Sequence, residues 1–335
     1  MHSLPLLPYS GPRLVGIARL AAHGESVRQG HEVEYFTLPV RSLLNRCTGT
    51  RMPFEWTINP YRGCEFACKY CFARYTHEFM EMRDGIEFEQ KIYAKQHAAD
   101  LLRQELRKVK TGESIALGTA TDPYQPIEKK LEITRGILQE IARHRGLEVG
   151  IVTKSAMVAR DIDALREIAK NNRISVSITV TTVDVELARL LEPRAPRPDL
   201  RLEALKKLRD AGIRAGVICA PVLPGITDTP TQLEAVVRAA AEAKATHIFA
   251  NPLFLKPCSA AVFMPFLREH FPKLLPEYEK RFKEKAFLPM AYRKRISELL
   301  VKLRMKYGIQ RESRWEEKKA PEDQQMELFR SAGKS

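Results

Sequence analysis

Short apolar runs rich in β-branched residues alternate with amphipathic stretches through the middle of the chain. Runs of this length bounded by turn residues are typical of buried strands. The predicted strands are Trp56–Ile58, Ser114–Leu117, Glu148–Thr153, Ile174–Val180, Gly216–Ala220 and His247–Ala250.

The stretches between these runs carry apolar residues three and four positions apart, the spacing of one helix face. Thr134 is a candidate N-cap of the second predicted helix, and Gly212 suits the end of the fourth. The five predicted faces are Leu101, Leu102, Leu106 and Val109; Ile137, Leu138 and Ile141; Ile162, Leu165 and Ile168; Leu202, Leu205 and Leu208; and Leu233, Val236 and Val237.

Alternation of strands and helices favours parallel strands joined by right-handed crossovers. We therefore predict an α/β fold, a partial (β/α)6 TIM-like barrel of parallel strands with a C-terminal helical extension. A doubly wound sheet would give a similar pattern. In both folds ligands bind at the carboxyl ends of the strands, so those ends are where functional side chains are expected.

The chain ends differ in pattern from this core. Residues 1–30 contain several prolines and glycines with little periodicity and are expected to form a flexible arm. The core domain is expected over residues 31–275, a basic helical segment over 276–310 and a disordered tail over 311–335. No stretch is apolar enough to cross a bilayer, and a cytoplasmic protein with no membrane association is expected.

Within the basic segment, residues 292–307 have the pattern of an amphipathic helix. Basic side chains crowd its polar face, where they could contact phosphates or could simply be solvated. The apolar face consists of Tyr292, Ile296, Leu299, Leu300, Leu303 and Tyr307.

The formal net charge of +14 makes nucleic acid a candidate partner. A generally basic, soluble surface would give the same balance. The net charge alone therefore does not distinguish a nucleic-acid-binding protein from one with a generally basic surface.

Three of the six cysteines lie within eight residues, at Cys64, Cys68 and Cys71, just after a predicted strand. In a reducing compartment this clustering indicates a metal site rather than disulfides. Three thiolates on one loop can hold three irons of a [4Fe–4S] cubane. The nearest other cysteine is Cys47, outside the loop, so one iron would keep an open coordination position.

A zinc site with His77 as fourth ligand is the main alternative, although its spacing is not a familiar zinc arrangement. Buried structural cysteines are disfavoured because Gly63, Glu65 and Lys69 indicate an exposed loop. The residues alone also allow a non-catalytic Fe–S or zinc protein that binds nucleic acid or senses redox state.

The triad has the spacing CxxxCxxC with an aromatic residue, Tyr70, before the last cysteine. This motif resembles the signature of the radical S-adenosylmethionine (SAM) superfamily. The resemblance extends over residues 56–271 and is similar to the spore-photoproduct-lyase-like, DNA-repair-photolyase-related branch. Its further motifs are GTATDPYQPIE (118–128), VTKS (152–155), SVSIT (175–179), EPRAP (192–196) and APVLPGITD (220–228).

The resemblance implies a radical SAM core domain, a [4Fe–4S] cluster held by Cys64, Cys68 and Cys71, and S-adenosyl-L-methionine on the open iron. In that superfamily reduction cleaves SAM and yields a 5′-deoxyadenosyl radical that abstracts hydrogen from a substrate. The electron is expected from a reductant such as flavodoxin or ferredoxin. The substrate is not indicated, and nucleic acid is one candidate.

The resemblance also assigns the cofactor contacts. Lys154 would meet the methionyl carboxylate, Thr121 and Asp122 the amino group, and Phe72 and Ala220 the adenine. Each also has an ordinary interpretation, as a solvated lysine, a turn or a strand position. Glu128 and Arg194 are weaker candidates. The full predicted set is Tyr70, Phe72, Thr121, Asp122, Lys154, Ser155, Ser177, Thr179 and Ala220.

Two departures from the branch argue against spore photoproduct repair by the same hydrogen relay. Thr119 stands where those lyases carry a hydrogen-donating cysteine, and Phe72 stands where they carry a tyrosine. Cys219 and Cys258, near the fifth and sixth strand ends, are candidate substitutes.

Overall fold

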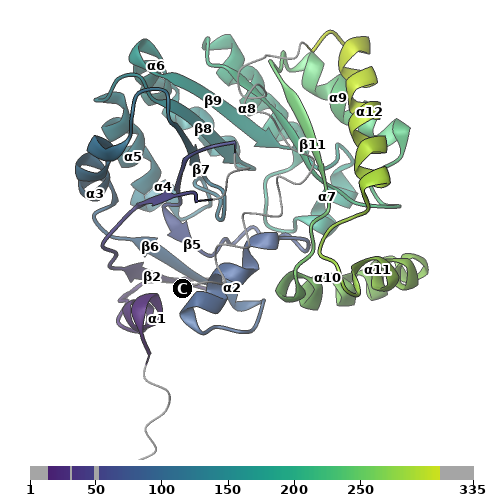
Figure 1. Cartoon of the computed structure of the whole chain (residues 1–335), viewed down its shortest axis with the longest axis horizontal. Coiled ribbons are helices and arrows are strands. Elements are labelled where there is room, and N and C mark those ends of the chain that lie inside the picture. The colour runs from purple at the N-terminus through teal and green to yellow at the C-terminus, as the bar shows by residue number, and fades with distance from the viewer. Residues whose placement is uncertain (1–13, 31, 49–52, 310–335) are drawn as a thin grey trace, which may run out of the picture.

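A computed structural model describes residues 14–30, 32–48 and 53–309, and its centre is a seven-stranded sheet of order β11-β10-β9-β8-β7-β4-β3 (Figure 1). Neighbours from β4 to β11 pair in parallel, and β3 joins antiparallel at the edge. The strands are β3 (Leu44–Arg46), β4 (Trp56–Ile58), β7 (Ser114–Leu117), β8 (Glu148–Thr153), β9 (Arg173–Thr179), β10 (Ala215–Val222) and β11 (Ile248–Pro252). The six predicted parallel strands and the α/β fold class are confirmed.

Helices cover the outer face of this sheet (Figure 1). The α-helices are α1 (Gly16–Ala22), α2 (Glu87–Gln90), α3 (Ala98–Glu105), α4 (Glu128–Leu131), α5 (Ile133–Ala142), α6 (Ile162–Asn171), α7 (Val185–Leu191), α8 (Pro198–Asp210), α9 (Pro230–Glu242), α10 (Pro257–His270), α11 (Leu275–Phe282) and α12 (Met290–Lys306). The 3-10 helices are η1 (Phe72–Met80), η2 (Leu106–Lys108), η3 (Ala156–Asp161) and η4 (Pro272–Leu274).

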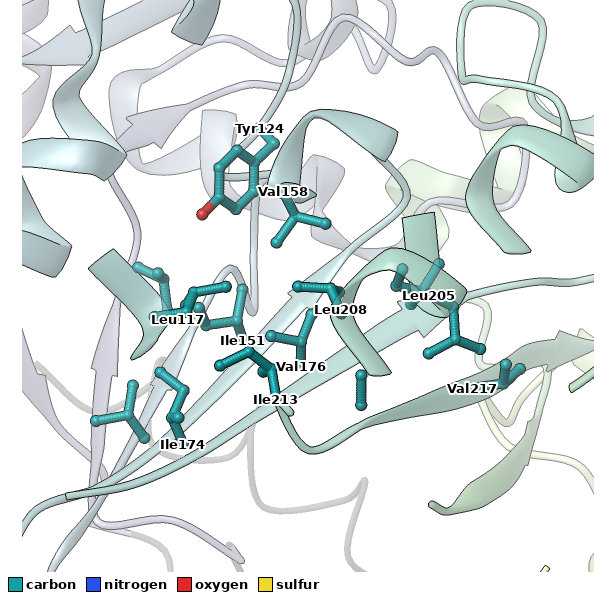
Figure 2. Packing of buried hydrophobic residues seen from close by; sticks show 14 of the residues in the cluster. Leu117, Tyr124, Ile151, Val158, Ile174, Val176, Leu205, Leu208, Ile213 and Val217 are labelled. Atoms are coloured by element: carbon teal, nitrogen blue, oxygen red, sulfur yellow. The ribbon is translucent and has the colours of Figure 1, made fainter. Parts of the chain in front are cut away.

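The two faces of the sheet differ in chemistry because side chains alternate along a strand. Outward-facing residues such as Ile151, Val176 and Val217 pack with Leu205 and Leu208 of α8 in the main hydrophobic core (Figure 2). The opposite, inner face carries mainly small or polar residues at the intervening positions, with Val152 and Ile218 as apolar exceptions: Ala116, Gly150, Ser175, Ser177, Thr179 and Gly216. The inner face is therefore suited to a ligand rather than to a packed core.

The five predicted helices form at α3, α5, α6, α8 and α9, with their apolar faces in the core. The prediction of Thr134 as an N-cap is wrong. Glu132 is the N-cap of α5, and Thr134 lies inside the helix, where its hydroxyl donates 2.5 Å to the Pro123 carbonyl. The threonine satisfies a loop carbonyl instead of a helix N–H.

A second sheet, of order β1-β2-β6-β5, was not predicted. Its strands are β1 (Ser26–Gly30), β2 (Val33–Leu38), β5 (Tyr61–Arg62) and β6 (Lys91–Lys95). The described part of the expected arm over residues 1–30 thus contains α1 and β1. The strand β5 has two residues, too few for any period to be read from the sequence.

The predicted amphipathic helix is present as α12, and all six residues of its apolar face belong to the main core or pack against it. Several of its basic side chains have acidic partners: Arg295 bonds Asp228 at 2.7 Å and Lys306 bonds Glu234 at 2.5 Å. These pairs favour the packing interpretation over phosphate contact. The expected tail over residues 311–335 lies outside the described residues, and none of the described helices is long and apolar enough to span a membrane.

Candidate functional site

The cysteine loop begins directly after β5 and ends where η1 begins. Gly63 opens it with φ +81, and a Cβ there would lie 2.7 Å from the Lys91 carbonyl and 2.9 Å from the Phe88 carbonyl. Only glycine fits this close approach to the neighbouring backbone. The N–H of Cys64 then donates to the same Phe88 carbonyl at 3.0 Å. The backbones of α2 and β6 therefore fix the position of Cys64 at the start of the loop.

The β7–α4 loop holds the cysteine loop from the other side. The Thr121 hydroxyl donates to the Gly63 carbonyl at 2.6 Å. The Gln125 amide donates to that carbonyl at 3.3 Å and accepts from the N–H of Glu65 at 3.1 Å. Gln125 is fully buried and was not predicted as a site residue. Thr121 and Gln125 thus shape the loop that carries the thiols.

The expectation of an exposed loop is wrong. Glu65 is 8% exposed, because its carboxylate accepts from the Tyr35 hydroxyl at 2.6 Å and from the N–H of Ile127 at 3.3 Å. Phe66 and Cys68 are buried, and Lys69 is half-buried. Glu65 is a buried hydrogen-bond acceptor in this loop, and the sequence does not distinguish such a carboxylate from a solvated one.

Two of the three thiols, those of Cys64 and Cys68, lie in surroundings that disfavour free thiolates. Burial raises the pKa of Cys64 well above its usual range, with Asp122 and the neighbouring thiols adding to the shift. Burial also raises the pKa of Cys68 to about 12, although Lys154 opposes the shift. A bound metal supplies the positive charge that stabilises buried thiolates. The donor set fits a thiolate-ligated metal group.

The geometry argues against a single zinc ion. Among the described residues, no three side chains of His, Cys, Asp or Glu are placed to hold one metal ion. His77, the candidate fourth ligand, bonds the Lys91 carbonyl through Nε2 at 3.0 Å and packs on Phe88. In a cubane each cysteine holds its own iron, so the sulfurs need not converge on one point.

Lys154 directly follows β8, and the alternation of side chains along this strand places it on the inner face of the sheet. Its Nζ lies 5.7 Å from the centre of the Tyr70 ring, above the cysteine loop. Within the described part of the chain, the ammonium makes no hydrogen bond or ion pair, and the side chain is half-buried. The nearby Cys68, Glu192 and Cys71 outweigh burial and raise its pKa. It is a cation available to an anionic group of a ligand.

Asp122 ties the ends of β7 and β8 together. Its carboxylate accepts from the Thr153 hydroxyl at 2.7 Å, the Lys154 N–H at 2.6 Å and the Tyr124 N–H at 2.9 Å. The last bond is that of an Asx turn, the ordinary interpretation of an Asp-Pro pair. Ser155 caps η3, where its hydroxyl accepts from the Met157 N–H at 3.2 Å. Asp122 therefore positions Lys154 through its backbone N–H, and Ser155 fixes the start of the helix that follows.

Tyr70 is held by a buried network that the sequence did not reveal. Its hydroxyl donates to Glu192 and lies 3.0 Å from the Thr181 hydroxyl, while Arg201 forms a salt bridge with Glu192. Glu192 and Arg201 are 2% and 1% exposed. The network links the cysteine loop to the strand ends of β9 and β10, since Thr181 also donates to the Ala220 carbonyl at 3.2 Å.

The remaining predicted contacts lie on the inner face or at its edge. The Ser177 hydroxyl is 3.0 Å from Nε2 of His247, so its partner is protein. Thr179, two positions further along β9, is buried at the same face. The Phe72 ring lies 6.4 Å from that of Phe254, next to the last cysteine.

The two weaker candidates have protein partners. Glu128 is fully buried, where it accepts from Tyr61 at 2.5 Å and pairs with Arg160 at 3.0 Å. Arg194 lies 3.7 Å from Glu32. Glu128 is thus part of a structural network beneath the loop.

The candidate hydrogen donors differ in position. Cys219 lies on the outer face within the main core, its thiol 3.9 Å from the Thr181 carbonyl, and burial raises its pKa to about 12. Cys258 is half-buried at the start of α10, where the neighbouring Ser259 donates to the Cys71 carbonyl at 2.8 Å. Thr119 accepts from the Asn59 amide at 3.2 Å. Packing in the core removes Cys219 from the candidate relay.

Sequence comparison finds relatives over most of the chain. An uncharacterized protein of Mycobacterium tuberculosis is 34% identical over 307 residues, 90% of each chain. An uncharacterized protein of Methanocaldococcus jannaschii is 30% identical over 225 residues, 67% of this chain and 80% of the relative. Both relatives are uncharacterized, so they assign no activity to this chain.

Solved structures show the fold. A mutant of spore photoproduct lyase superposes with a TM-score of 0.63 at 16% identity, covering 82% of this chain and 80% of that one. The lyase complexed with dinucleoside spore photoproduct gives 0.60 at 16% identity, with 82% and 79% covered. A radical SAM superfamily sequence model matches residues 58–238, which span the cysteine loop and the strands β7 to β10. The chain belongs to the radical SAM superfamily.

Proposed function

We propose that this chain is a radical SAM enzyme that holds a [4Fe–4S] cluster on Cys64, Cys68 and Cys71. The proposal is carried by the Lys154 ammonium, which has no acidic partner in the described chain and lies above the cysteine loop at a strand end. That is where a radical SAM enzyme needs a cation for the methionyl carboxylate. Superfamily membership supports the same chemistry.

Bound together, the cluster and SAM supply reductive cleavage of a C–S bond and a 5′-deoxyadenosyl radical that abstracts hydrogen from the substrate. The chain's own residues prepare the site. Thr121 and Gln125 hold the cysteine loop, and Asp122 fixes the backbone of Lys154. Glu192 holds the Tyr70 ring beneath the Lys154 ammonium. These bonds keep the binding groups in place before the ligands arrive.

The mainly small and polar side chains of the inner face make it the proposed place for the rest of SAM. Thr179 and Ala220 lie near strand ends beside the Tyr70 network, and we propose that they contact the adenosine of SAM. Ser177 would contact it only by sharing its hydroxyl with His247.

The proposed substrate class is nucleic acid or a nucleotide-containing molecule. The net charge of +14 is compatible with a polyanion, and the lyase of similar fold was solved with a dinucleoside photoproduct. Thr119 and Phe72 argue for a reaction that does not use the lyase's hydrogen relay. A carrier such as flavodoxin or ferredoxin is the proposed electron source.

Anaerobic reconstitution followed by metal analysis and electron paramagnetic resonance tests the metal assignment. We expect about four irons per chain and a reduced cluster signal that changes when SAM is added. Cys68→Ala should lose the signal, whereas the control Cys47→Ala, near the edge strand β3, should keep it. Tightly bound zinc, or an iron content unaffected by Cys68→Ala, would refute the assignment and favour a non-catalytic or redox-sensing protein.

A further inference from the structure

A lysine of the second sheet is buried without a counter-ion. Lys95, the last residue of β6, is 7% exposed. In the described part of the chain its ammonium makes no hydrogen bond and no ion pair. Burial and the nearby Arg62 lower its pKa to about 7, while Glu105 opposes the shift. Buried lysines are ordinarily paired with an anionic group. The described chain provides no such group in contact with Lys95, so an external anion is a candidate partner.

A second cation lies beside it. Arg62 of β5 donates one guanidinium N–H to the Thr76 carbonyl at 3.0 Å, but its Nε is buried without a partner. No carboxylate of the described residues forms an ion pair with it. Two neighbouring cations therefore share one region of the sheet, and neither forms an ion pair with a carboxylate of the described residues.

The strand register puts both side chains on one face. Arg62 pairs with Tyr93 across β5 and β6, and Lys95 is two residues beyond Tyr93. Diagonal neighbours of this kind have backbones about 7–8 Å apart, within reach of long side chains. Glu105, the acidic group that influences Lys95, already accepts from the N–H groups of Leu43 and Leu44 at 3.0 and 2.8 Å.

The pair lies at the edge of the candidate site. Arg62 is two residues before Cys64, and the Lys95 N–H donates to the Pro60 carbonyl at 3.1 Å. The adjacent Asn59 bonds Thr119 and the N–H of Ala120, beyond the end of β7. The same short segment thus connects the two cations to the cysteine loop and to the strand ends.

We propose that Arg62 and Lys95 form a binding site for a phosphate group of the substrate. An ammonium and a planar guanidinium together match the charge and the several oxygens of a phosphate. A carboxylate carries a single negative charge and would neutralise only one of the two cations. Only the assignment of this phosphate to the substrate rests on the proposed function; binding of phosphate by the two cations does not. The phosphate comes from a nucleic-acid backbone or from a phosphomonoester, and the experiment distinguishes the two.

The test compares Lys95→Met with Lys91→Met in the full-length, reconstituted protein. Lys91 begins the same strand and pairs with Glu87 at 2.7 Å near the surface, so it is a matched control. Inorganic phosphate should raise the Tm of the wild type and of Lys91→Met by a few degrees, and that of Lys95→Met by much less. Lys95→Met should be folded, because removing a buried charge without a partner relieves desolvation; Lys95→Gln gives a second variant.

Fluorescence anisotropy with a labelled oligonucleotide and its uncharged methylphosphonate analogue identifies the source. Weaker oligonucleotide binding by Lys95→Met, by about tenfold and with a shallower salt dependence, supports a backbone phosphate. An effect on inorganic phosphate alone supports a phosphomonoester. Equal phosphate stabilisation of wild type and Lys95→Met, or none in either, would overturn the site. Neither readout requires SAM cleavage, so failure of the catalytic proposal remains a separate result.

Discussion

The Lys154 ammonium lies 5.7 Å from the centre of the Tyr70 ring, the aromatic residue that precedes the last cysteine of the triad. The two residues come from the end of β8 and from the cysteine loop, 84 positions apart (154 − 70). Asp122 accepts a hydrogen bond from the Lys154 N–H, and Glu192 accepts one from the Tyr70 hydroxyl. The contact therefore joins the loop to the strand ends in one preorganised site.

Replacing Lys154 by Met should weaken SAM binding by about 10–100-fold, because a charge-assisted bond to the methionyl carboxylate is lost. Equilibrium dialysis with labelled SAM on the reconstituted protein measures this. The control Lys170→Met removes an exposed lysine paired with Glu167 and should bind normally. Unchanged affinity in Lys154→Met would mean that the ammonium does not contact SAM.

Replacing Gly63 by Ala should prevent the cysteine loop from forming, because the new Cβ would meet two backbone carbonyls. Gly112 is a matched control, since it has φ +82 and nothing within 4 Å of an added Cβ. Gly112→Ala should cost about 1 kcal/mol from backbone strain alone. Iron content and chemical denaturation compare the two variants, and equal behaviour would show that the close approach at Gly63 is unimportant.

Replacing Glu192 by Gln should destabilise the fold by about 3–5 kcal/mol, because Arg201 would be left buried without a counter-charge. The exposed pair of Glu203 and Lys207 offers the control, and Glu203→Gln should cost about 0–1 kcal/mol. Urea unfolding measures both. A small effect of Glu192→Gln would show that the network around Tyr70 tolerates an unpaired guanidinium.

The stability should fall as the pH decreases below about 6.5, partly through His247. Burial and the nearby Arg214, Arg304 and Arg209 lower the pKa of this histidine to about 3. Its ordinary pKa is about 6.5, so between these values the unfolded chain binds a proton that the folded chain does not. Each such group contributes a slope of about 1.4 kcal/mol per pH unit.

Unfolding free energies of the wild type and His247→Gln between about pH 5 and 6.5 isolate this contribution. The wild-type slope should exceed that of the variant by about half a proton at pH 6.5 and by nearly one proton at pH 5. Identical slopes would mean that His247 is protonated equally in both states.

The parallel strands were predictable because buried β-branched runs carry their own signal; β4 and β7 begin and end as predicted. The thiol triad was predictable because its ligands are close in sequence. Gln125 and Glu192 were not, since each acts through hydrogen bonds to residues more than 60 positions away, at Gly63 and Tyr70. Spacing carries no information on such contacts. The cysteine loop was wrongly predicted to be exposed for a related reason: a buried carboxylate that accepts hydrogen bonds, such as that of Glu65, cannot be distinguished from a solvated one in the sequence.

The most direct test of the central claim is chromatographic analysis of the anaerobic, reduced protein after incubation with SAM. We expect 5′-deoxyadenosine and methionine from the wild type and from the Cys47→Ala control. Neither product should form with Cys68→Ala or Cys71→Ala. An intact, reduced cluster that formed no 5′-deoxyadenosine in the presence of bound SAM would contradict the proposed catalytic function.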